Sequence, residues 1–302
     1  MKPCYNNPNL KQEVKERSRN KISSPRCTLY SQTVPKDNLI TDMHIHTTYS
    51  DGSLKPAEIV SLAAKLDIQK IAVTDHDTMA GCSEAIEAGR KAGINVISGV
   101  EISAYDFQKG RKVHILGYDI KDVKALEAAC RPFLESRHQA RLKALQRIIE
   151  AGYPVTEAEV LGYIRPGGTL YRQHIMNALL DRGYAVTIYG ELYRKLFART
   201  GIAFIQSKYM DVFDALKLVL DTGGTAVLAH PYLYDSEDLL PELVESGLSG
   251  IEVWSSKHTA QQTADLKRLA KRYGLEQYEG SDFHGFYSER VNPLGSTMQG
   301  GA

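Results

Sequence analysis

Imidazole and carboxylate side chains recur in this sequence at the ends of short apolar segments that have the pattern of β-strands. The runs LITDMHIH, KIAVTDH, VISGVE, TAVLAHP and QYEGSDFH each finish in such groups, and two more lie in TTYSDG and HILGY. The candidate set is His44, His46, Asp51, His76, Glu101, His114, His230, Asp282 and His284. Because the carboxyl ends of parallel strands form the active-site face of an α/β barrel, we expect these side chains to converge.

The spacing of the histidines favours chelation of metal. Side chains alternate along a strand, so His44 and His46 project to the same side and can bind one ion, and Asp282 and His284 repeat the arrangement. A lone His-x-His pair is weak evidence, since a buried histidine is more often a hydrogen-bonded core residue. Six of the nine histidines together with three carboxylates favour a metal centre instead.

The ligand chemistry indicates hydrolysis of a phosphoester. Nitrogen and oxygen ligands without thiolates suit Mn, Fe or Zn better than Ca or a soft metal. A catalytic zinc takes about three protein ligands, so nine candidates predict a cluster of two or three ions. Such clusters clamp a phosphate and supply a metal-bound hydroxide near neutral pH.

The elements that must position these groups alternate between strand and helix. Segments such as PAEIVSLAAKL and MAGCSEAIEAGRKAG separate the β-type runs, which predicts a parallel α/β sheet or barrel. Between about residues 123 and 221 the strand pattern stops and helical periodicity replaces it, as in an inserted helical subdomain. Residues 1–38 are basic and poor in large apolar groups, so we expect a disordered tail.

Composition excludes several classes of protein. A 43% hydrophobic and 24% charged chain is ordinary for a globular protein, and 37 basic side chains nearly balance 36 acidic ones. Overall charge therefore recruits neither nucleic acid nor a membrane. The four cysteines lie far apart, no run is long enough to span a bilayer and the N-terminus does not read as a secretory signal, so we expect a cytoplasmic protein without a membrane partner.

The motifs together resemble the PHP (polymerase and histidinol phosphatase) superfamily. They are HIHTTYSDG, TDHDT, GVEIS, HILGY, AHP and GSDFHG, in the family's order from about residue 40 to 287. The resemblance implies an α/β fold, a distorted (β/α)7 barrel of about seven strands. Residues 39–122 and 222–302 would form the barrel and residues 123–221 the mainly helical insertion.

The resemblance also implies a division of the ligands among three ions. One ion would take His44, His46, Glu101 and Asp282, and a second would take Glu101, His114 and His230. The third would take Asp51, His76 and His284. Some relatives carry a histidine where Asp51 stands, and an aspartate there would weaken or change the third site.

Substrate residues are implied by the nucleotide branch of the family, in which an arginine for the substrate phosphate lies in a G-R-P-H or G-R-T-H motif. LYRQHIMNALLDRGY supplies Arg172 and His174, whereas Gln173 and Tyr171 depart from that motif. From the sequence itself, Arg137 and Arg141 could share a phosphate or form a solvated helix face. Further candidates are Ser103 and Lys208 for substrate, and Asp75 for orienting a ligand histidine from behind.

Three functions remain open on the sequence. The first is a phosphatase that removes a phosphate from a small nucleotide such as a nucleoside 3',5'-bisphosphate. The second is a 5'-to-3' exonuclease on short 5'-phosphorylated RNA or DNA, with Arg137, Arg141 and Lys143 as a basic track. The third is a metal-binding module without catalysis, which the complete set of ligands argues against. Neither a nucleophile elbow nor a P-loop motif occurs.

Overall fold

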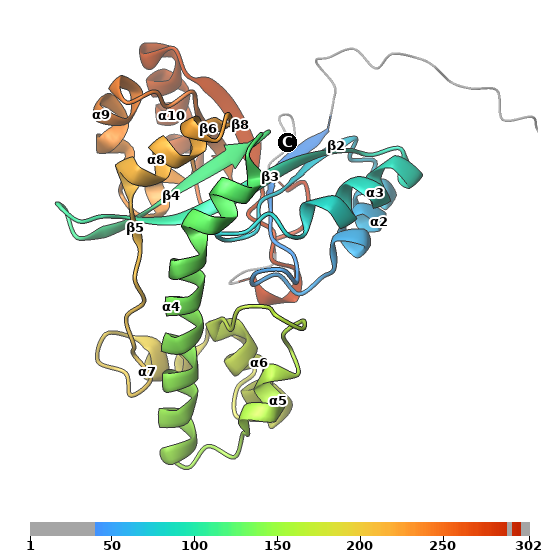
Figure 1. The fold of residues 1–302 in the computed structure, drawn as a ribbon, viewed down its shortest axis with the longest axis vertical. Coiled ribbons are helices and arrows are strands. Elements are labelled where there is room, and N and C mark those ends of the chain that lie inside the picture. The colour runs from blue at the N-terminus through green and yellow to red at the C-terminus, as the bar shows by residue number, and fades with distance from the viewer. Residues whose placement is uncertain (1–39, 289–291, 297–302) are drawn as a thin grey trace, which may run out of the picture. The chain divides into compact units, whose positions relative to one another are not determined.

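The computed structural model describes residues 40–288 and 292–296, and the predicted tail, residues 1–38, lies outside them. Two groups of parallel strands provide most of the sheet (Figure 1). The first group is β1 (Thr41–Ile45), β2 (Lys70–Val73) and β3 (Asn95–Asp106). The second is β6 (Thr225–Leu228), β7 (Gly250–Ser255) and β8 (Glu276–Gly280).

Strand β4 (Arg111–Tyr118) joins the two groups and runs antiparallel to both β3 and β6, so the prediction of a wholly parallel sheet was wrong here. Residues 107–110 form a tight turn between β3 and β4. A parallel connection needs a crossover of a dozen or more residues, so four residues allow only a hairpin. A short strand, β5 (Met210–Asp211), pairs with the outer end of β3.

The sheet nearly closes on itself, which confirms the predicted distorted barrel. The segment after β8 lies beside the end of β1, where the His46 amide donates to the Phe283 carbonyl at 2.9 Å. The Phe283 amide donates in turn to the His44 carbonyl at 3.2 Å. Closure therefore brings the first and last ligand-bearing segments of the chain together.

The two faces of the barrel strands carry different clusters of side chains. On β4, Val113 and Ile115 belong to the main hydrophobic core. Leu116 and Tyr118 belong to a second cluster, with Val227 of β6. Because side chains alternate along a strand, His114 lies on the same face as this second cluster. The interior is thus apolar in one part and carries ionisable groups in another.

Helices cover the outer face of the sheet (Figure 1). They are α2 (Pro56–Lys65), α3 (Cys82–Ala92), α8 (Val212–Asp221), α9 (Leu240–Glu245) and α10 (Ala260–Tyr273). Helix α3 packs on β3, α8 on β3, β4 and β6, and α10 on β7 and β8. Short 3-10 turns lie at Pro231–Leu233, Glu237–Leu239 and Gly285–Tyr287.

A helical segment lies between β4 and β5 and has a hydrophobic cluster of its own. It contains α4 (Val123–Glu150), α5 (Glu157–Leu161), α6 (Arg172–Asp181) and α7 (Glu191–Phe197). Helix α8 instead contributes Val212, Leu216 and Val219 to the main core. The domain boundaries stay a prediction. None of the helices in the described part of the chain is long and apolar enough to cross a membrane.

Candidate active site

The carboxylate of Glu101 lies at the centre of the site. It projects from β3 and is only 1% exposed. Five imidazole nitrogens lie 2.7–3.3 Å from its two oxygens, from His44, His46, His76, His114 and His230. His114 reaches it because antiparallel β4 places Ser103 and His114 opposite each other, two residues from Glu101 along β3. The hairpin that the sequence analysis missed therefore delivers a ligand candidate.

The histidines keep Glu101 ionised. Burial by itself would raise the pKa of this carboxyl, but the charges of His114, His76 and His44 outweigh it and hold the pKa well below its usual range. A buried anion of this kind is stable only where cations or hydrogen bonds compensate it. The centre of the site is thus a compensated negative charge inside a barrel.

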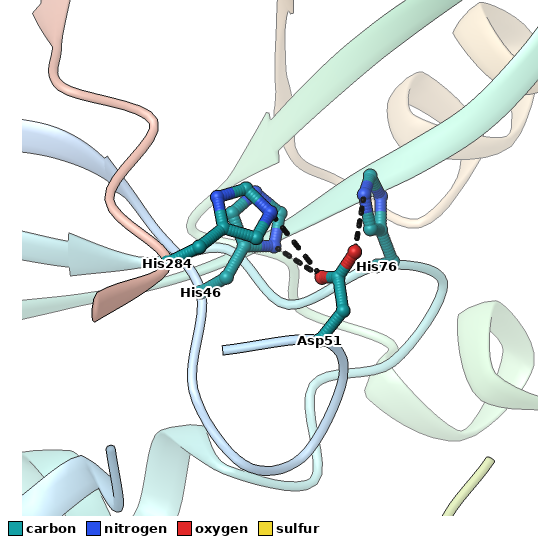
Figure 2. A group of neighbouring side chains, drawn as sticks. All are labelled: His46, Asp51, His76 and His284. Carbon is teal, nitrogen blue, oxygen red and sulfur yellow. Dashed lines mark ion pairs between the residues drawn. The ribbon is translucent and has the colours of Figure 1, made fainter. Parts of the chain in front are cut away.

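Asp51 forms a second focus of the cluster, in the loop after β1. Figure 2 shows its carboxylate between His76 on one side and His46 and His284 on the other. Asp51 Oδ1 lies 3.3 Å from His284 Nε2 and 3.7 Å from His46 Nδ1, and Oδ2 lies 3.8 Å from His76 Nε2. The structure therefore brings together all nine candidates from the sequence.

Three groups of side chains have the geometry to hold a metal ion, each with potential ligand atoms within 4.8 Å of one another. They are His44, His46, Glu101 and Asp282; His76, Glu101 and His114; and His46, Asp51, His76 and His284. The first group has the membership that the family resemblance implies. The second contains His76 instead of His230, although His230 Nε2 lies 2.9 Å from Glu101. The third adds His46 to the implied set.

The donor atoms fit divalent cations. His44 Nε2 and His46 Nε2 lie 3.2 Å apart, and both face Glu101 Oε2. Asp51 Oδ1 and His230 Nδ1 are buried and have no hydrogen-bond partner among the described residues. Converging nitrogen and oxygen lone pairs of this kind are the donors that Mn, Fe and Zn accept.

Backbone strain occurs at two of the ligand candidates. His230 has φ of 24° and Asp282 has φ of 56°, both in the left-handed region that non-glycine residues rarely adopt. Such strain persists where the surrounding structure holds it, and it is concentrated at functional sites. Each residue follows directly or closely on a strand, β6 or β8, so the strain turns the chain sharply at the barrel end.

Two buried carboxylates outside the three metal groups fix the loops that carry ligands. Asp75 accepts hydrogen bonds from the Thr47 amide at 2.8 Å, the Thr47 hydroxyl at 2.7 Å and the Ser50 hydroxyl at 2.5 Å. It therefore holds the loop of Asp51. From the sequence we expect Asp75 to orient a ligand histidine; the structure places it against Thr47 and Ser50, and Ser50 Oγ in turn lies 3.4 Å from His46 Nδ1.

Asp42 likewise accepts hydrogen bonds from a ligand-bearing segment, the one after β8, and this role was not predicted from the sequence. It accepts from the Ser281 amide at 2.9 Å, the Ser281 hydroxyl at 2.6 Å and the Gly295 amide at 2.8 Å. Ser281 immediately precedes Asp282, so the bond ties the end of β8 to β1. Asp42 lies two residues before His44 on the same face of β1, and this spacing could have predicted a role at the site.

A cavity of about 250 Å³ opens above the metal-ligand cluster. Lys257 is one of five cations that line it, and the other four form a cation wall: Lys112, Arg137, Arg141 and Arg172. Six tyrosines also line the cavity: Tyr171, Tyr189, Tyr193, Tyr209, Tyr234 and Tyr287. Arg137 is paired with Asp77 at 2.5 Å. In the described part of the chain no carboxylate pairs with the other three cations of the wall. Helices α4 and α6 supply the arginines and β4 supplies Lys112, so the helical segment provides most of this wall.

The cations of the wall act on one another. Burial, with the neighbouring Arg172 and Arg137, lowers the pKa of Arg141 to about 9. Burial also lowers the pKa of Lys112, and the three arginines add to the effect. For Tyr209 burial would raise the pKa, but the surrounding cations outweigh it and lower the pKa. An anion bound here would relieve this repulsion.

The substrate residues expected from the sequence divide into two groups. Arg172, Arg137 and Ser103 line the cavity, and the Ser103 hydroxyl lies 3.1 Å from His76 Nδ1. His174 and Lys208 do not line it. The buried His174 ring accepts a hydrogen bond from the Tyr171 amide at 3.1 Å, and Lys208 is exposed, with its amide donating to Ser136.

Gln173, which departs from the family's substrate motif, contacts Asp51 in one of the groups able to hold a metal. Its side-chain amide donates to Asp51 Oδ2 and to the Tyr189 hydroxyl, each at 2.8 Å. Lys257 also lines the cavity, with Nζ 3.3 Å from Asp282 Oδ2. Lys112, Lys257 and the tyrosines other than Tyr171 lie in no motif, so only packing of the helical segment over the barrel identifies them.

Known proteins that are similar to this chain have functions that agree with the chemistry inferred for the site. The model of the PHP domain matches residues 42–224, and the chain belongs to this family. A phosphoribosyl 1,2-cyclic phosphate 1,2-diphosphodiesterase of Eggerthella lenta is 45% identical, over 85% of this chain and 98% of the relative. A 3',5'-nucleoside bisphosphate phosphatase of Chromobacterium violaceum is 32% identical, over 80% and 86%. A 5'-3' exoribonuclease of Haemophilus influenzae is 31% identical, over 80% and 89%.

A solved structure shows the same fold. It is described as a metal-dependent phosphoesterase from Bifidobacterium adolescentis, with a TM-score of 0.78 and 29% identity over 85% of this chain and 91% of that one. The relatives and this structure confirm the prediction of a hydrolase that acts on phosphoric ester bonds.

We expect a His174→Gln variant to lose less stability than the wild-type protein when the pH falls. Burial lowers the pKa of His174 to about 4, against 6.5 for a free imidazole. The unfolded chain therefore binds more protons between these values, so the His174 contribution to stability is full above pH 6.5 and is lost as the pH falls toward 4. The difference in unfolding free energy between the two proteins should change by about 2 kcal/mol from pH 7 to pH 5, as measured by urea unfolding. Parallel curves for the two proteins would contradict this environment for His174.

Proposed function

We propose that this chain hydrolyses a phosphoric ester of a small ribose derivative that carries a second phosphate. The observation that carries the proposal is the pair of charged surfaces that line one small cavity. The first surface consists of residues from the candidate metal groups, and the second consists of Lys112, Arg137, Arg141 and Arg172. A reacting phosphate would lie at the first surface and a non-reacting phosphate at the second.

The first substrate to consider is a cyclic phosphodiester of a phosphorylated ribose. The relative that is 45% identical is named for a phosphoribosyl 1,2-cyclic phosphate, and its alignment covers almost its whole length. That substrate class was not considered from the sequence alone. The nucleoside 3',5'-bisphosphate expected there has the same two-phosphate character, and six tyrosines lining the cavity offer faces for a base.

An exonuclease is less well supported. A cavity of about 250 Å³ matches a mononucleotide or sugar phosphate better than a strand. Of the expected basic track, Arg137 and Arg141 line the cavity, whereas Lys143 is exposed and lies outside the lining. The cations are thus gathered in a pocket rather than spread along a groove.

In the proposed mechanism the chain binds and orients its substrate by fixed charges. Two or three divalent ions held by the three side-chain groups, with Mn, Fe or Zn as candidates, would supply Lewis-acid stabilisation and acidify a coordinated water. Arg172 and Arg141 bind the non-reacting phosphate and set the distance to the reacting one. Lys257 adds a positive charge beside Asp282, and the tyrosines exclude water.

Substrate comparison tests the proposal directly. We expect purified protein with Mn to release product from phosphoribosyl 1,2-cyclic phosphate or adenosine 3',5'-bisphosphate faster than from a short 5'-phosphorylated RNA. Removal of metal with a chelator should abolish turnover, and added Mn should restore it. Mononucleotide release from the RNA as the fastest reaction would overturn the small-substrate proposal in favour of the exonuclease.

A charge variant tests the second phosphate separately. We expect Arg172→Met to raise KM by on the order of 10–100-fold for a two-phosphate substrate, because a charge-assisted hydrogen bond contributes about 1.5–3 kcal/mol. A substrate that lacks the second phosphate should react equally with variant and wild-type protein. Lys208→Met, at an exposed position outside the cavity, is the matched control. An equal loss on both substrates would show that Arg172 does not recognise the second phosphate.

A further inference from the structure

Glu252 is a buried carboxylate that belongs to none of the three groups able to hold a metal. It lies in the middle of β7 and is 1% exposed. Oε1 lies 3.1 Å from His44 Nδ1, and Oε2 accepts a hydrogen bond from the His230 amide at 2.7 Å. Both oxygens are therefore engaged by residues that face Glu101.

The contact with His44 determines which ring nitrogen can bind a cation. A carboxylate accepts hydrogen bonds, so the proton of a neutral His44 ring is held on Nδ1. This leaves the Nε2 lone pair free, and Nε2 is the atom that faces Glu101 at 3.3 Å and Asp282 at 3.6 Å. The opposite tautomer would direct an N–H into the metal group.

The contact with His230 holds strained backbone in place. With φ of 24°, this residue needs a partner that fixes its peptide group, and Glu252 Oε2 is the acceptor for that amide. The His230 ring then reaches Glu101 Oε1. A single carboxylate thus fixes a ring in one metal group and a backbone turn beside another.

The neighbouring strand leaves space for this carboxylate. A Cβ atom on Gly280 of β8 would collide with both Glu252 Oε1 and His44 Cβ. Glycine at this position therefore permits the approach of Glu252 to His44, and a side chain there would separate them.

We propose that Glu252 is a positioning residue for the metal centre, which presents His44 Nε2 and the His230 turn for metal binding without binding metal itself. The inference rests on the proposed metal centre. Outer hydrogen bonds of this kind commonly change metal affinity by about 10–100-fold when they are lost.

The decisive variant is Glu252→Gln, which keeps size and shape. A glutamine amide must place its NH₂ group against His44 Nδ1, which moves the ring proton to Nε2, or against the His230 N–H, where two donors meet. We expect Mn to bind about 10–100-fold more weakly, as measured by equilibrium dialysis with metal analysis. Saturating Mn should restore most of kcat. Glu276→Gln, on the exposed start of β8, is the control and should bind Mn like the wild-type protein.

Three outcomes separate the possibilities. Wild-type protein that binds none of Mn, Fe and Zn would overturn the metal centre itself, and this inference with it. A folded Glu252→Gln variant with wild-type Mn affinity would overturn the inference alone. If the variant does not fold, ¹⁵N NMR of the Zn-loaded wild-type protein decides: a proton on His44 Nδ1 supports the inference, and a proton on Nε2 overturns it.

Discussion

The site depends on one buried negative charge, the carboxylate of Glu101, surrounded by five imidazoles. Taking a carboxylate out of water costs several kcal/mol unless it is compensated, so the groups around it must arrive together. They come from β1, β2, β4 and β6 or the residues just after them. Closure of the sheet between β1 and β8 and the antiparallel course of β4 are the features of the fold that satisfy this demand.

Three further buried carboxylates hold the segments around this centre by hydrogen bonds. Asp42 ties the end of β8 to β1, Asp75 holds the loop of Asp51, and Glu252 fixes His44 and His230. The cavity beside this centre is also lined by the wall of cations, which β4 and the helical segment supply. The barrel thus contributes the candidate metal ligands, and the helical segment contributes most of the positive charge. A cavity with both surfaces suits a small molecule with two phosphates.

The sequence could predict which side chains converge at the site because their positions follow from a local rule, the presence of ionisable groups at strand ends, and their role as metal ligands stays a prediction. Alternation along the strand placed His44 and His46 on one side, and the other ionisable strand ends made a shared site the favoured interpretation. The direction of β4 was missed because the strand pattern does not encode it, although the short DFQKGRK turn allowed only a hairpin. Glu252 was missed because GIEVW reads as an apolar core strand, and Lys112 because its role depends on how the helical segment packs over the barrel. His174 was expected at the substrate because of its motif, whereas the structure places its ring away from the cavity, against the start of α6.

Metal binding by a Glu101→Gln variant tests the central claim most directly. The protein would be stripped, reloaded with Mn and analysed for metal per chain, with circular dichroism to confirm folding. We expect two or more Mn ions per wild-type chain and no more than one in the folded variant, because the two metal groups that share Glu101 would lose their common anion, whereas the group around Asp51 does not contain it. Equal Mn content in folded wild-type and variant protein would contradict it.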